Sequence, residues 1–148
     1  MKIRVLMAVI ALAAAASTPA LACSIGRIRP AELQREQWRD LREANLIFVA
    51  RVVSYGWSED TDDNVTFYEP LQLVSREGVL PENFSIATLT CLPVPALGEV
   101  HVFLMRTADA PRTPGEVGTL LGYYDVSGVL HPSLRRRVEP ALQRANIE

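Results

Sequence analysis

LIFVARVVSY, residues 46–55, is the most strand-like stretch of the chain. Its β-branched and aromatic side chains suit a pleated surface that is at least half buried. The stretch begins as a continuous apolar run and then alternates between apolar and polar residues, which indicates a β-strand. We therefore expect a strand here, and the segments on either side are interpreted around it.

The segment before this strand predicts an amphipathic helix of about 14 residues. Pro30 suits the first helical turn, and Leu33, Trp38 and Leu41 lie near one helical face. Asn45 is a suitable stop before the strand.

Four more strands are expected after it, because each segment is apolar, alternates and is bounded by Gly, Pro or polar residues. They cover residues 65–75, 84–90, 99–106 and 118–126. Pro70 interrupts the first of them, which predicts a bulge or an edge position. In the segment 99–106, alternation places Val100, Val102 and Leu104 on one side of the strand and His101, Phe103 and Met105 on the other.

A second helix is expected from Ser133 to about Ala145, kinked or split at Pro140. Short, serially connected strands with two flanking helices predict a mainly β domain, a small antiparallel barrel or sandwich. The sequence shows no internal repeat and no linker, so residues 23–148 are expected to form a single domain.

Residues 1–22 have the features of a signal peptide. Lys2 and Arg4 form a basic start, residues 5–16 are apolar but too short to span a bilayer, and residues 20–22 read Ala-Leu-Ala. We expect cleavage after this Ala-Leu-Ala, which makes Cys23 the first residue of an exported chain that is periplasmic or secreted.

The charge of the mature chain argues against nucleic-acid binding. Loss of Lys2 and Arg4 leaves 13 basic residues, all arginine, against 17 acidic ones, a net charge of −4. Proteins that bind nucleic acids usually present a basic face. No segment after residue 22 reaches the roughly 20 apolar residues that a membrane helix needs, so no transmembrane segment is expected.

Cys23 and Cys91 are the only cysteines, and an even pair in an oxidising compartment predicts a disulfide. Closing a loop of about 68 residues stabilises a fold by roughly 4 kcal/mol in the chain-entropy model. One alternative is that both thiols stay free. The other is that Cys23 is the lipid attachment site of a lipoprotein, the one case in which a membrane is involved. Such sites usually carry a leucine three places earlier, where this chain has Ala20.

The sequence contains no recognisable catalytic or cofactor motif, so we do not expect this chain to be an enzyme. His101 and His131 are the only histidines, and His101 lies within a strand, which favours a structural or surface role. The acidic segment 60–64 begins like a calcium loop, but Val65 and Leu71 stand where that loop needs glycine and glutamate. We expect a solvated hairpin tip there, no cofactor, and no metal belonging to the chain itself.

A free amine on Cys23 offers one chemical possibility. An α-amine has a pKa of about 7.7–8.0, so part of it is neutral near pH 7. Its nitrogen and the carbonyl oxygen of the same residue can close a five-membered chelate on a metal ion. A catalytic zinc keeps an open position that such a chelate could occupy, and a disulfide would hold the terminus in place.

The order of these features resembles the netrin-like (NTR) module of tissue inhibitors of metalloproteinases and their bacterial relatives. The residues that carry the resemblance are Cys23-Ser24, the helix, the run 44–52, Thr90-Cys91 and the run 98–104, with His101 where an aromatic residue is expected. The resemblance implies an OB-like five-stranded barrel with packed helices and a disulfide between Cys23 and Cys91. It also implies that the Cys23 amine and carbonyl chelate a protease zinc while Ser24 enters the specificity pocket.

This chain departs from the animal inhibitors at Ile25, where they carry a second cysteine. Two functions of different class therefore stay open. One is inhibition of a zinc metalloproteinase through Cys23 and Ser24. The other is a secreted or periplasmic NTR-like protein-binding module, or a lipoprotein, with no inhibitory activity.

Overall fold

The structure is a computed structural model that describes residues 29–58, 63–76, 78–82, 84–87, 94–107 and 118–147. The predicted signal peptide, Cys23, Ser24, Cys91 and the acidic residues 59–62 lie outside the described residues. In chain order the elements are α2 (Pro30–Glu43), β1 (Leu46–Ser58), β2 (Asp63–Leu73), β3 (Phe84–Ala87), β4 (Val100–Arg106), β5 (Thr119–Asp125) and α3 (Pro132–Arg144).

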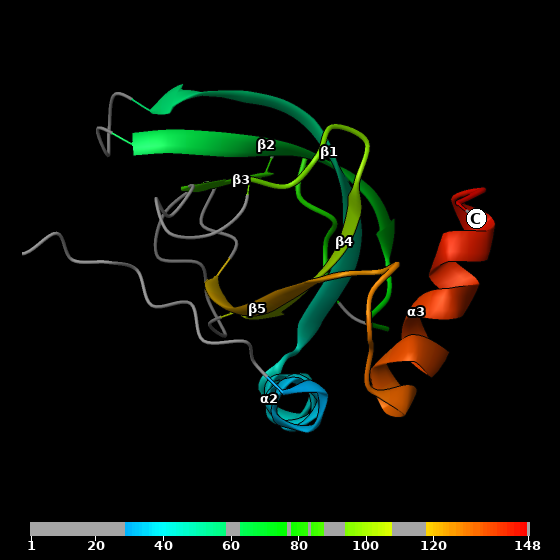
Figure 1. Cartoon of the computed structure of the whole chain (residues 1–148). Coiled ribbons are helices and arrows are strands. Elements are labelled where there is room, and N and C mark those ends of the chain that lie inside the picture. Colours follow the sequence, from blue (N-terminus) through cyan, green and yellow to red (C-terminus); the bar gives the residue numbers. More distant parts are fainter. Residues whose placement is uncertain are drawn as a thin grey trace, which may run out of the picture.

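The five strands form one antiparallel sheet in the order β3-β2-β1-β4-β5. The sheet curls into a half-barrel, with α3 along its outer side and α2 near one end (Figure 1). The predicted mainly β fold with two flanking helices is confirmed, and the curled single sheet is consistent with a barrel-like architecture.

Apolar side chains are buried on both faces of the sheet, because β1 and β4 carry them at successive positions. The outer face packs against the two helices, with a core formed by Leu41, Ile47, Val49, Val100, Val102, Leu104, Leu130, Leu134, Val138 and Ala141. The inner face has its own core, formed by Leu46, Phe48, Ala50, Val52, Tyr68, Phe103 and Met105. The predicted division of β4 into two faces is thus confirmed for five of its six assigned residues. His101 lies on the inner side with Phe103 and Met105.

The predicted strand limits need correction in β1 and β2. The strand expected over residues 46–55 is longer: β1 continues through Gly56, which pairs with Val65, and the pairing reaches Ser58 and Asp63. The prediction of a bulge at Pro70 is confirmed, because the register slips between Val49 and Ala50 where Ala50 faces Pro70. β2 as a whole lies between β1 and β3, but its pairing with β3 spans only Val65–Tyr68. Pro70 therefore lies beyond the described β3 partner and pairs only with β1.

The predicted kink or split at Pro140 does not occur as a split. The helix runs unbroken through this residue to Arg144. Proline removes one backbone donor and crowds the preceding turn, but Leu134, Val138 and Ala141 on either side of it are all buried against the sheet. Tertiary packing of this apolar face holds the helix together across the proline.

Helix α2 presents polar side chains to the protein interior, and Trp38 is 43% exposed rather than part of a buried apolar face. Gln37 donates from Nε2 to the Val129 carbonyl (3.0 Å) and its Oε1 accepts from the His131 backbone N–H. The carboxylate of Asp40 accepts from the Tyr124 hydroxyl at 2.6 Å. These bonds attach α2 to β5 and to the connection that leads into α3.

Among the described helices, none is both long enough and apolar enough to pass through a bilayer.

Candidate functional site

Two carboxylates and a histidine meet at the inner side of the sheet, where β4 begins and β5 ends. His101 pairs with Asp125 across the two strands, and Glu99 precedes His101 by two residues, so strand alternation turns it to the same side. One ligand atom from each of the three residues lies within 4.8 Å of the other two. His101 is only 4% exposed, whereas both carboxylates are half-buried.

Each carboxylate of this Glu99–His101–Asp125 cluster accepts hydrogen bonds from residues nearby in the sequence. Glu99 Oε2 accepts from the Ala96 backbone N–H at 2.6 Å. Asp125 accepts from the backbone N–H of Ser127 at 2.8 Å and from the hydroxyl of the same serine at 2.6 Å. His101 Nε2 lies 3.4 Å from Glu99 Oε1, and the buried Nδ1 has no hydrogen-bond partner among the described residues.

Aromatic rings enclose the imidazole on its protein side. The ring centroids of Tyr68 and Tyr123 lie 5.8 and 5.6 Å from that of His101, and the ring of Phe103 lies 6.4 Å away. Burial raises the pKa of Tyr68 far above its usual value, and the nearby Tyr123 and Glu99 add to the effect. The cluster is therefore polar where the half-buried carboxylates lie and aromatic around the buried histidine ring.

Three buried or half-buried tyrosines make the stability of the folded protein depend on pH in the alkaline range. Burial raises the pKa of Tyr68 and of Tyr123. Burial also raises the pKa of Tyr124, and the hydrogen bond that its hydroxyl donates to Asp40 raises this pKa further. A raised folded-state pKa means that the neutral hydroxyl is favoured in the folded protein. Their stabilisation is thus complete below the unfolded-state pKa of about 10 and is lost as pH rises above it.

We expect the free energy of unfolding of the mature protein to fall between about pH 9.5 and pH 11. Lys2 is the only lysine of the sequence, so after signal cleavage no lysine titrates in this range. Urea unfolding across it measures the slope, and Tyr124→Phe should make the slope shallower although it also removes the bond to Asp40. A flat profile, or an unchanged slope in Tyr124→Phe, contradicts this prediction.

A second feature is an apolar patch of exposed side chains, which we define as Val53, Tyr55 and Trp57 of β1 with Val94 and Leu97 of the segment before β4. Trp57 is 56% exposed and Leu97 is 62% exposed. The Tyr55 hydroxyl donates to the Pro95 carbonyl. Two backbone bonds of 2.9 Å, from Gly98 N–H to Val52 O and from Val52 N–H to Glu99 O, hold this segment along β1. Large exposed apolar patches are typical of protein-binding sites.

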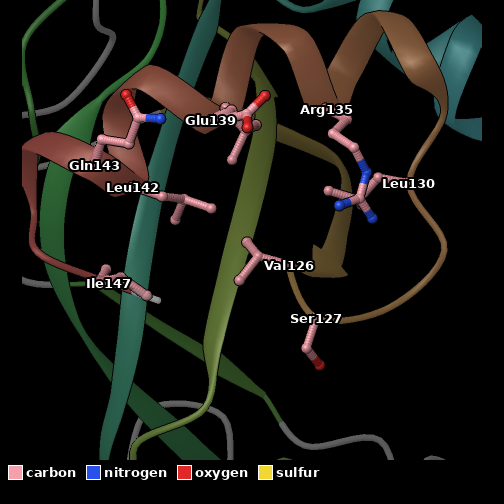
Figure 2. A pocket seen from close by; sticks show the side chains of 9 residues that line it. Val126, Ser127, Leu130, Arg135, Glu139, Leu142, Gln143 and Ile147 are labelled. Carbon is pink, nitrogen blue, oxygen red and sulfur yellow. The ribbon is translucent and has the colours of Figure 1, made fainter.

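A third feature is a cavity of about 380 Å³ between α3 and the connection that follows β5 (Figure 2). Its walls are mainly apolar, with Val126 and Leu130 on one side and Leu142 and Ile147 on the other. Arg135 lies at its margin, where it donates to the Gly128 carbonyl at 3.1 Å. The sequence patterns did not predict this cavity, because its walls come from segments that each look like ordinary core or helix surface.

The structure places the two histidines but not the predicted chelating residues. His131 caps α3 by accepting from the Ser133 N–H and stacks on Trp38. His101 is buried beside two carboxylates. The sequence pattern did not predict this cluster, because Asp125 is 24 residues away from His101 in the sequence. The local signal was Glu99 two residues before a strand histidine, which becomes informative only once the β4–β5 register is known.

Comparison with known proteins assigns no family: no protein-family model matches the chain, and neither does any curated protein.

Proposed function

We propose that the mature chain is an exported protein that inhibits a zinc metalloproteinase through its N-terminal Cys23, on an OB-like barrel. The observation that carries this proposal is the apolar patch, because it begins three residues after Cys91. A protein that inhibits a protease needs an apolar contact surface beside the group that reaches the catalytic centre. In this proposal the chain itself is not an enzyme.

The strand order supports the OB-like part of the proposal. An OB-fold is a five-stranded, partly open barrel. Here β1 pairs with both β2 and β4, which leaves β3 and β5 at the two edges of a sheet that already curls (Figure 1). Further curling of the same sheet would bring these two edges together, and the inner core would then be the barrel interior.

A disulfide between Cys23 and Cys91 would place the N-terminus beside the patch. The two Cα atoms of a disulfide are about 5.5 Å apart, and three residues of extended chain span at most about 11 Å. Cys23 would then lie within about 16 Å of Val94. Because α2 begins at Pro30, only six residues separate Cys23 from an ordered helix, which restricts the terminus further.

In the inhibited complex the Cys23 amine nitrogen and carbonyl oxygen occupy the open position of the protease zinc, and Ser24 enters the adjoining pocket. The amine must lose its proton to bind the zinc. Because its pKa is about 7.7–8.0, this deprotonation costs little free energy near neutral pH. The apolar patch then covers the rim of the protease cleft, where Trp57 is the largest exposed side chain. Aromatic residues of this kind commonly dominate the affinity of protein interfaces.

Adding one alanine before Cys23 should raise the inhibition constant against a susceptible zinc protease by at least about 100-fold. The extension moves the amine one residue away and turns Cys23 N into an amide that cannot chelate. A variant with one alanine after Glu148 is the matched control and should inhibit like the wild type. The intact mass of the exported protein comes first, because an acylated Cys23 would refute the mechanism, as would equal inhibition by the two variants.

The protein-binding module without inhibitory activity is the second candidate, and the same apolar patch favours it. In that case the alanine extension leaves partner binding intact, whereas Trp57→Ala weakens it. For the inhibitor, both changes weaken binding. Binding measurements on these two variants, with a partner captured by the wild-type protein, therefore separate the two functions.

A further inference from the structure

We propose that Glu99, His101 and Asp125 form a binding site for a divalent transition-metal cation that belongs to this chain itself. The site is independent of the N-terminal chelate of the proposed function, because it uses other residues. It also departs from the sequence-based expectation that the chain has no metal of its own.

The donor set suits such a cation. One imidazole nitrogen and two carboxylate oxygens are ligands that Zn²⁺ accepts, with a further position left for water. Imidazole nitrogen favours transition metals such as zinc over magnesium or calcium. Among the described residues neither carboxylate forms an ion pair with an arginine, so the negative charge of the cluster is left for a cation to balance.

The state of His101 is the second, independent observation. Its Nε2 is 3.4 Å from Glu99 Oε1, which is longer than a normal hydrogen bond, and its Nδ1 has no partner among the described residues. A buried polar group left in this condition costs free energy, and an ion or a water molecule is the usual way in which it is satisfied. The imidazole is buried, has a nitrogen within 4.8 Å of an oxygen of each carboxylate, and forms no normal hydrogen bond.

The surroundings also resemble those of a metal site. The bonds from Ala96 N–H to Glu99 and from Ser127 to Asp125 orient the two carboxylates, as outer partners of metal ligands do. Each carboxylate keeps lone pairs that these bonds do not use. The ligand atoms spread over up to 4.8 Å, and bonds of about 2.1 Å to zinc need a separation nearer 3.4 Å. The half-buried carboxylates can make this small movement, while the strand holds His101 in place.

Isothermal titration of the metal-free, oxidised mature protein with ZnCl₂ tests the site, and the visible absorption bands of bound Co²⁺ report the coordination geometry. We expect one Zn²⁺ per chain, with His101→Ala abolishing binding and Glu99→Gln or Asp125→Asn weakening it by at least about 10-fold. His131→Ala is the matched control, because it removes the only other histidine, and should bind zinc like the wild type.

The alanine extension before Cys23 should also leave zinc binding unchanged, which separates this site from the terminal amine. A thiol assay showing no free cysteine separates it from thiolate ligation. Binding that survives in Glu99→Gln and Asp125→Asn, or that disappears with the N-terminal extension, overturns the proposal. So does the absence of zinc binding in the wild type. The two carboxylate variants decide the matter if His101→Ala does not fold, because their side chains are only half-buried.

Discussion

Replacing Phe103 with alanine is expected to reduce the free energy of unfolding by about 3–5 kcal/mol. Phe103 is 0% exposed and lies at the centre of the inner core. Its ring stacks on Phe48 at 5.2 Å and on Tyr123 at 5.7 Å, and it meets Tyr68 and Phe84 edge-on at 4.9 Å each. Alanine would leave a cavity among four aromatic rings that the strands around it cannot close.

Urea unfolding of the two proteins measures this loss, which is a large part of the roughly 5–15 kcal/mol that holds a typical domain folded. Phe67→Ala is the matched control on β2, because that ring is 39% exposed and lies outside both cores. We expect the control to cost no more than about 1 kcal/mol. Equal losses for the two variants would show that Phe103 does not hold the inner core together.

Replacing Gln37 with leucine should cost about 2–4 kcal/mol of stability although the new side chain is apolar and nearly equal in size. The buried amide bonds two backbone groups, the Val129 carbonyl and the His131 N–H, which connect β5 to α3. Leucine leaves both groups without a partner at a site where the native side chain is 1% exposed. The loss thus comes from unsatisfied hydrogen bonds and not from a cavity.

Gln34→Leu is the control for this prediction. Gln34 lies on the same helix and is half-buried, and the structure describes no side-chain hydrogen bond for it, so its replacement should change stability by less than about 0.5 kcal/mol. Gln37→Glu adds a finer test, because glutamate can still accept from His131 but cannot donate to Val129. Thermal or urea unfolding that ranks Gln37→Leu with Gln34→Leu would contradict the assigned role.

The contrast between Gln37 and Trp38 shows where sequence patterns reach their limit. Helical periodicity predicted an apolar face that included Trp38, since its ring is large and apolar. In the structure Trp38 stacks on His131 and remains 43% exposed, while Gln37 is buried. The burial of Gln37 follows from the backbone groups of residues 129 and 131 that need its amide, and no local pattern in the helix reveals them.

The strand LIFVARVVSY and its neighbours were predictable because alternation, β-branching and turn residues are local properties of the chain. The sequence by itself determined the five strands, the two helices and the two faces of β4. Tertiary structure alone decided that β1 lies at the centre of the sheet and that His101 faces Asp125. The physical reason is strand register: a shift of one residue turns every side chain to the other face, and pairing between distant segments sets that register.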